Sequence, residues 1–178
     1  EGITLRTLLD SRGNETIEAE IMTCSGGYGR ACAPSGASTG IYEAKARPCR
    51  EAVADARARL IPELMELDAQ DQRTFDETLH TVDATEDLSG IGANIAVALS
   101  LANAKAAAST LNLELFQYLG GTFVDQTPLP LGNVIGGGAH AVDATDIQEF
   151  LIVPTGAATA SEAVFTNARV HKTVKEIL

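Results

Sequence analysis

The spacing of apolar residues changes once along the chain, and this change limits the possible folds more than any other feature. Before residue 34 apolar and polar residues alternate: Ile17, Ala19 and Ile21 share one face of an extended segment, while Glu18 and Glu20 share the other. Such alternation is typical of a half-buried β-strand. After residues 34–40 the apolar residues recur at steps of three and four, as on one face of an α-helix. The sequence therefore predicts strands first and helices afterwards.

The predicted strands are short and follow one another closely. Residues 3–9 alternate imperfectly, and residues 10–14, Asp-Ser-Arg-Gly-Asn, have the composition of a turn. Residues 25–27, Ser-Gly-Gly, can adopt the positive φ angles of a tight turn before a third extended segment at residues 28–33. We expect the second and third strands to form an antiparallel hairpin, and all of them together a small meander.

Several helices are predicted between the meander and residue 121. Two amphipathic helices are separated near Asp68, and a third, at residues 92–110, is so rich in Ala that its backbone can approach its neighbours closely. We expect this third helix to be the most buried. A short helix at residues 113–119 ends at a Gly-Gly pair, which is a common helix stop. The apolar positions of the first two helices are Val53, Ala56, Leu60 and Leu64, then Phe75, Leu79 and Val82.

The composition shifts at residues 122–130, where two prolines indicate a linker or an entry strand. We therefore expect one domain at residues 1–124 and the beginning of a second at residues 125–178. The second contains a strand at 131–135, a glycine run at 136–138, a strand at 146–153 and a helix at 161–178. This helix is expected to begin with a capping box of Thr159 and Glu162 and to present one apolar face made of Val164, Ala168, His171, Val174 and Leu178.

Charge and composition exclude several classes of protein. The chain has 24 acidic and 13 basic residues and a net charge of −11, so a polyanion such as nucleic acid would be repelled. No apolar run reaches the roughly 18 residues of a membrane span. Acidity with scarce lysine fits either adaptation to high salt or a moderately acidic mesophilic protein, and the sequence leaves both open. The odd number of cysteines, three, in no Cys-x-x-Cys pattern predicts reduced thiols and no zinc site.

The beginning of the chain has neither the basic start nor the apolar stretch of a signal peptide. We therefore expect a soluble protein of the cytoplasm.

Three segments contain more polar or flexible residues than packing requires. Residues 33–40 are small and leave backbone amides uncovered, which suits either a loop that closes on an anionic ligand or a plain flexible connector. His140 follows the glycine run, where a histidine is either functional or simply solvated. Gln148 and Glu149 lie within an otherwise apolar strand, and alternation would send one of them into an apolar wall. Because a buried unpaired carboxylate is costly, we expect a polar site there.

The order and spacing of five motifs resemble the enolase (phosphopyruvate hydratase) family along the whole chain, and most of all the enolases of halophilic archaea. The motifs are Asp-Ser-Arg-Gly-Asn at 10–14, Pro-Ser-Gly-Ala-Ser-Thr-Gly at 34–40, Gly-Ala-Asn at 92–94, Gly-Gly-Ala-His-Ala at 137–141 and Gln-Glu-Phe at 148–150. The chain departs from the family at Glu15 and Gly136, where proline and asparagine are usual, and has a shorter stretch after residues 42–44.

The resemblance implies an α+β N-terminal cap domain, made of a three-stranded antiparallel meander plus helices, followed by the first elements of a C-terminal β/α barrel. It also implies the reversible dehydration of 2-phosphoglycerate to phosphoenolpyruvate, with two magnesium ions per active site. The partner would be this small phosphorylated substrate, and the full enzyme a homodimer or higher homo-oligomer.

The resemblance assigns roles to five residues. Ala37 belongs to the loop that closes on substrate, and Ser38 binds the second magnesium ion. His140 closes toward the phosphate end of the substrate, and Gln148 and Glu149 belong to the acid side near the departing hydroxyl. The family's catalytic lysine, its principal acid glutamate and its three carboxylate ligands for the first magnesium would lie beyond Leu178, so this chain alone is expected to be inactive. The alternative is a non-catalytic binding or scaffold domain derived from the enolase cap.

Overall fold

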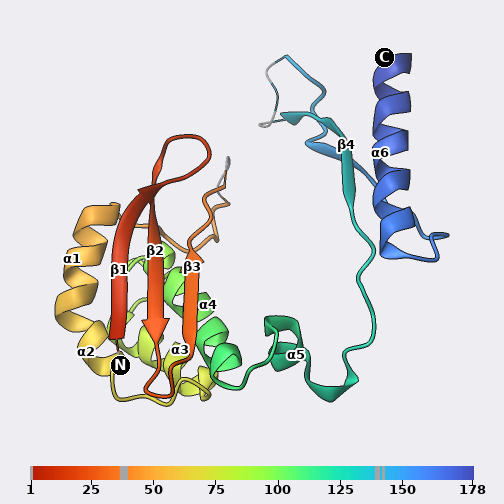
Figure 1. Cartoon of the computed structure of the whole chain (residues 1–178). Coiled ribbons are helices and arrows are strands. Elements are labelled where there is room, and N and C mark those ends of the chain that lie inside the picture. The colour runs from red at the N-terminus through yellow and green to blue at the C-terminus, as the bar shows by residue number, and fades with distance from the viewer. Residues whose placement is uncertain (1, 37–39, 139–140, 142) are drawn as a thin grey trace. The chain divides into compact units, whose positions relative to one another are not determined.

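The computed structural model describes residues 2–36, 40–138, 141 and 143–178. The chain forms two compact units, Glu1–Val124 (unit 1) and Asp125–Leu178 (unit 2). Unit 1 consists of a sheet with helices, and unit 2 of a strand pair with one helix (Figure 1).

The first strands of unit 1 form the predicted antiparallel meander. Strands β1 (Gly2–Leu9), β2 (Glu15–Met22) and β3 (Tyr28–Cys32) lie side by side in this order (Figure 1). The β2–β3 turn contains Gly26 at a φ of 83°, which is the left-handed conformation expected of this glycine pair. The predicted hairpin is therefore confirmed.

The helices of unit 1 are α1 (Cys49–Arg59), α2 (Ile61–Leu64), α3 (Gln72–Asp83), α4 (Ala93–Thr110) and α5 (Leu115–Gly120), followed by the 3₁₀ turn η1 (Gly121–Phe123). The first predicted helix is divided at Leu60 into α1 and α2. Pro62 explains the division, because proline has no N–H to donate to the preceding turn.

The core of unit 1 lies between one face of the sheet and helices α1, α3 and α4. Leu5, Ile17 and Ala19 are fully buried on the sheet side. Helix α4 contacts β2 and β3, and its buried side chains outnumber those of every other helix, as predicted. A Cβ atom on Gly29 of β3 would lie 2.0 Å from the carbonyl oxygen of Ala102. The helix backbone thus approaches the sheet too closely for any side chain at position 29.

The opposite face of the sheet is polar. Arg6 pairs with both Glu18 and Glu20, and Arg30 lies 3.7 Å from Glu18. Tyr28 donates to Glu20 at 2.7 Å. The alternation along β2 therefore separates a buried apolar face from an ion-paired one, as the sequence predicts.

Unit 2 contains the antiparallel strands β4 (Gly132–Gly136) and β5 (Glu149–Ile152), with helix α6 (Ala160–Ile177) against β4. Thr159 accepts from the Glu162 amide at 3.1 Å, but the Glu162 carboxylate binds the Ala158 amide rather than that of Thr159. The predicted capping box is thus shifted by one residue in its second bond.

The predicted apolar face of α6 is largely exposed within unit 2. Val164 is 55% exposed and Leu178 is 88% exposed, whereas Ala163 is fully buried. Asn167, one turn after Ala163, donates to the Pro130 carbonyl at 3.0 Å and lies over Gly132, which has no side chain to obstruct it. Ala163 and Asn167 therefore face β4, and the absence of a side chain at Gly132 makes room for Asn167.

Within the described part of the chain, no helix is long and apolar enough to cross a membrane.

Helix α3 ends on a residue in the left-handed conformation that is not glycine. Ala84 has a φ of 58°, and its N–H donates to the His80 carbonyl at 2.9 Å. Because a Cβ atom is unfavourable in this conformation, we expect Ala84→Gly to raise the free energy of unfolding by about 0.5–1 kcal/mol. Urea denaturation gives the measurement.

Ala54→Gly is the matched control, since Ala54 is an exposed position inside α1. There the same substitution should lower the free energy of unfolding by about 1 kcal/mol. If both substitutions destabilised the protein equally, the backbone of Ala84 would not be strained.

Candidate functional site

The meander brings two of the recognised motifs to one end of the sheet. Because the strands are antiparallel, the β1–β2 connection and the end of β3 lie at the same end (Figure 1). The turn at residues 10–14 is therefore near residues 33–36, although β2 separates β1 from β3 by two strand spacings, about 10 Å.

Arg12 bridges this distance with its side chain. One guanidinium nitrogen, Nη2, donates to the carbonyl oxygens of Ser35 at 2.6 Å and Gly36 at 3.2 Å, and also to the Ser35 hydroxyl at 3.2 Å. Thr16 of β2 adds a buried bond of 2.6 Å to the Ala33 carbonyl. The start of the loop at 33–40 is thus fixed to the sheet.

Asp10 completes this arrangement, which we call the loop anchor (Asp10, Arg12, Ser35 and the Gly36 carbonyl). Its carboxylate accepts from the backbone amides of Arg12 and Asn14, each at 2.8 Å, and from the Ser35 hydroxyl, also at 2.8 Å. The hydrogen bonds of Asn14 and Ser35 lower the pKa of Asp10 from 3.8 to about 2. Asp10 is therefore a carboxylate at every physiological pH.

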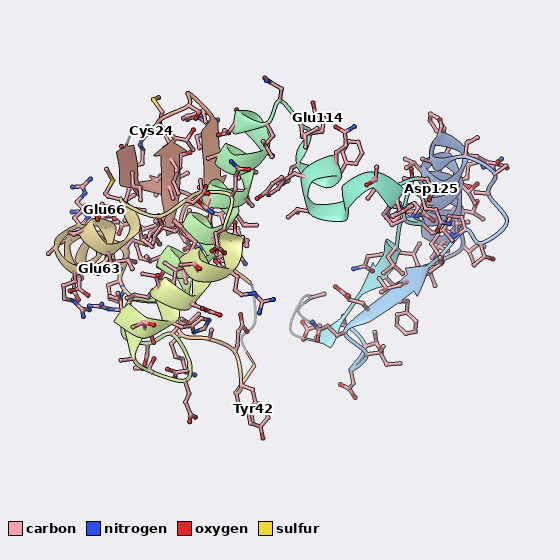
Figure 2. The ribbon with its side chains drawn as sticks, turned by 90° about the horizontal axis from the view of Figure 1, so that it is seen from below. Cys24, Tyr42, Glu63, Glu66, Glu114 and Asp125 are labelled. Carbon is pink, nitrogen blue, oxygen red and sulfur yellow. The ribbon has the colours of Figure 1, made fainter. Side chains whose placement is uncertain are left out.

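The chain that follows this loop is fixed to α4 at Arg47, shortly before α1 begins. The Asn94 side chain donates to the Arg47 carbonyl at 2.9 Å and accepts from the Arg47 amide at 3.2 Å. Before this clamp, the Gly40 amide donates to the Glu43 carboxylate at 2.9 Å. Tyr42, 95% exposed, points away from the helices (Figure 2). The segment between β3 and α1 is thus held near both ends, while Tyr42 between them projects outward.

The Arg47 side chain ties this clamp to two further elements. It donates to Asp55 of α1 at 2.8 Å and to the Gly90 carbonyl in the α3–α4 connection. Arg59 approaches Asp55 at 2.6 Å. The hydrogen bonds of Arg59 and Arg47 hold the pKa of Asp55 well below its ordinary range. The positive charge of Arg47 is thus paired with Asp55, close to the N-terminus of α4.

A cavity of about 730 Å³ lies between the two anchored ends. Its lining includes the charged residues Glu15, Glu43, Lys45 and Arg47. Both signs of charge are present, although apolar residues such as Pro34, Pro48 and Val97 also line the cavity.

Unit 2 brings together two more motifs. The β4–β5 pairing sets Gly136 opposite Glu149, and the Gly137 amide donates to the Gln148 carbonyl at 2.7 Å. A Cβ atom on Gly137 would lie 2.3 Å from the Ile147 carbonyl oxygen, so only glycine fits here. The glycine run and the Gln-Glu pair therefore form one hairpin, which the sequence did not predict.

The residues of unit 2 do not by themselves form the apolar wall expected beside Gln148 or Glu149. Glu149, Phe150 and Leu151 are all exposed in β5, and Gln148 lies just before the strand. The physical reason is that a two-stranded sheet with one helix against it cannot bury both faces of a strand.

The remaining predicted site residues, Ala37, Ser38 and His140, lie outside the described residues. Among those that are described, no group of three or more His, Cys, Asp or Glu side chains could hold a metal ion. The described part of the chain thus does not fit a magnesium site of its own.

Comparison with known proteins identifies the family. Residues 1–119 match the family model "Enolase, N-terminal domain", and residues 125–178 match "Enolase, C-terminal TIM barrel domain". The chain belongs to the enolase family. The predicted fold class, an α+β N-terminal domain followed by the start of the barrel domain, is confirmed.

Several curated relatives of the chain are named enolase. The enolase of Methanocorpusculum labreanum is 82% identical over 99% of this chain, which covers 44% of that protein. The enolase of Haloarcula marismortui is 58% identical over 99% of this chain, again 44% of the relative. Enolases of halophilic archaea are thus close relatives, as expected, but the methanogen protein is more similar. The chain spans less than half the length of these relatives.

Sequence reasoning recognised the enolase motifs at 10–14 and 92–94 but assigned them no function. The structure shows that the turn at 10–14 anchors Ser35, at the start of the segment between β3 and α1. Asn94 of the second motif clamps Arg47, near the end of that segment. A signal was available at residues 10–14, because an aspartate in a turn commonly accepts a hydrogen bond from the backbone amide two residues on, as Asp10 does from Arg12. No local signal pairs Asn94 with Arg47, which are 47 positions apart.

The depressed pKa of Asp10 predicts a defined pH dependence. Because the folded pKa, about 2, lies below the ordinary value of 3.8, the contribution of Asp10 to stability is complete above about pH 4 and is lost as the pH falls toward 2. Asp10→Asn should therefore be less stable than the wild type at neutral pH, and the difference should shrink below about pH 4. Urea denaturation of both proteins between about pH 7 and pH 3 measures it; a difference that is constant down to pH 3 would contradict the assignment.

Proposed function

We propose that the whole protein is an enolase that catalyses the reversible dehydration of 2-phosphoglycerate to phosphoenolpyruvate in glycolysis and gluconeogenesis. The observation that carries this proposal is the hairpin of unit 2, which holds the glycine run before His140 directly against Gln148 and Glu149. Two family motifs with roles on the same substrate are thus joined in one short element, and a fold without catalytic function would not require their joint retention.

Unit 1 would supply the loop that closes on the substrate. We assign Ala37 to substrate contact and Ser38 to the second magnesium ion, as the family resemblance implies. The anchoring of the flanking residues supports this assignment, because a loop that is fixed at both ends can order its middle at a lower entropic cost.

Unit 2 would supply the phosphate end and the acid side of the site. We assign His140 to closure toward the phosphate, and Gln148 and Glu149 to the departing hydroxyl. The lysine that removes the proton alpha to the carboxylate, and the principal acid glutamate, are assigned to parts of the enzyme that this chain does not contain.

Two magnesium ions per active site belong to the same proposal. Hard divalent cations require several oxygen ligands, preferably carboxylates. Because the described residues form no such cluster, we assign the main ligands to the rest of the enzyme and derive no step through the ions here.

The remaining expectations also become proposals. Units 1 and 2 would correspond to the cap domain at residues 1–124 and the beginning of the barrel domain at residues 125–178. The enzyme would act in the cytoplasm as a homodimer or higher homo-oligomer, without nucleic acid or membrane as a partner. The alternative, a non-catalytic scaffold derived from the cap, would need none of Ser38, His140, Gln148 and Glu149.

Activity measurements separate the two functions. The full-length protein should convert 2-phosphoglycerate to phosphoenolpyruvate in the presence of magnesium, which is followed by the ultraviolet absorbance of the product. The 178-residue chain, with its mass confirmed, should show no turnover, because the proton-abstracting lysine is assigned elsewhere. A full-length protein that is folded but inactive would favour the scaffold, and activity of the short chain would refute our division of catalytic roles.

Glu149→Gln tests the acid side in the full-length enzyme. The substitution keeps the shape and removes the charge, so an interaction made mainly in the transition state would be lost. We expect kcat to fall about 100- to 10,000-fold with KM nearly unchanged. His140→Ala is the comparison and should mainly raise KM. If Glu149→Gln folded normally and kept kcat within about threefold of the wild type, Glu149 would be only a strand residue.

A further inference from the structure

Arg12 bonds mainly to the backbone of a segment more than twenty residues away. Its nearest carboxylate, Asp10, is 3.9 Å from Nε, which is a weak exposed ion pair. Its shorter bonds are directed to the backbone carbonyls of Ser35 and Gly36. Both carbonyls accept from the same nitrogen, Nη2, so one charged group holds two successive peptide groups of the loop start.

We propose that Arg12 and Asp10 are positioning residues of the active site: they hold the backbone of Ser35 and Gly36, from which the substrate loop continues to Ala37 and Ser38. This inference rests on the function proposed above for that loop. It assigns a role to the Asp-Ser-Arg-Gly-Asn turn, for which the family resemblance supplied none.

The anchor is itself held rigidly, as a positioning group must be. Asp10 is bonded by the amides of Arg12 and Asn14, which close the turn around its carboxylate. The same carboxylate accepts from the Ser35 hydroxyl. Asp10 thus connects the turn to the loop from one side, while Arg12 connects them from the other. Ser35 is bonded through both its side chain and its carbonyl, which leaves it little freedom to rotate.

The consequence concerns the backbone of Ser35 and Gly36, which leads into the substrate loop. The anchor holds these two residues in one arrangement relative to the sheet. Without it, Ser35 and Gly36 would spend a smaller fraction of time in the binding-competent arrangement. The apparent affinity for substrate falls in proportion to that fraction. Loss of the anchor should therefore act on KM, whereas loss of Glu149 should act on kcat.

The test uses the full-length protein with Arg12→Ala, Arg12→Lys and the control Arg50→Ala. Arg50 is a more exposed arginine near the same end of the sheet, its side chain being 83% exposed against 44% for Arg12, and its guanidinium bonds Glu15 at 3.1 Å. We expect Arg12→Ala to raise KM for 2-phosphoglycerate at least about tenfold with kcat within about threefold. Arg12→Lys, which keeps the positive charge on a shorter side chain, should be intermediate. Arg50→Ala should match the wild type.

Hydrogen–deuterium exchange of the ligand-free variants gives a second readout that does not depend on activity. Arg12→Ala should speed exchange in peptides that contain Ser35 and Gly36 and leave the α4 amides as in the wild type. Faster exchange throughout unit 1 would show a general stabilising role and overturn the proposal, as would an unchanged KM. A wild-type protein without dehydratase activity would refute the proposed function, while the exchange data would still decide whether Arg12 fixes the loop.

Discussion

The close approach of α4 to the sheet is the constraint on which the rest of unit 1 depends. Gly29 lets the helix backbone come so near to β3 that no side chain fits between them. The helix surface in contact is built mainly of alanine, which gives a tight interface with little loss of side-chain entropy. Because this contact fixes α4 against β2 and β3, it also fixes the position of Asn94 in the first turn of the helix.

This packing fixes both ends of the segment between β3 and α1. The meander places the Arg12 turn beside the end of β3, and α4 places Asn94 beside Arg47. The two anchors use different chemistry: one is a charged guanidinium on exposed carbonyls, and the other is a neutral amide that pairs with both backbone groups of a single residue. The charged group of Arg12 remains exposed to solvent. The neutral amide of Asn94 is half-buried, where both of its polar atoms are paired.

Unit 2, unlike unit 1, has no extensive apolar core, because its elements are too few to bury one another. Ile147, Phe150 and Leu151 remain exposed on the hairpin, and Phe165 remains exposed on α6. What the unit does fix is local: the pairing of the glycine run with Gln148 and Glu149 depends on hydrogen bonds and on the absence of a side chain at Gly137, not on a core.

The sequence by itself determined the order of strands and helices, the meander, the buried alanine helix and, through five spaced motifs, the family. These features are local or periodic, so neighbouring residues carry the information. The split of the first helix at Pro62 could also have been read from the sequence, because the missing N–H is a local property. Only the tertiary structure decided that Arg12 reaches Ser35, that Asn94 clamps Arg47, that α6 turns Asn167 toward Gly132 and that Glu149 is exposed. Each of these depends on which distant backbone lies alongside, and that is set by packing and register across the fold, which no single segment encodes.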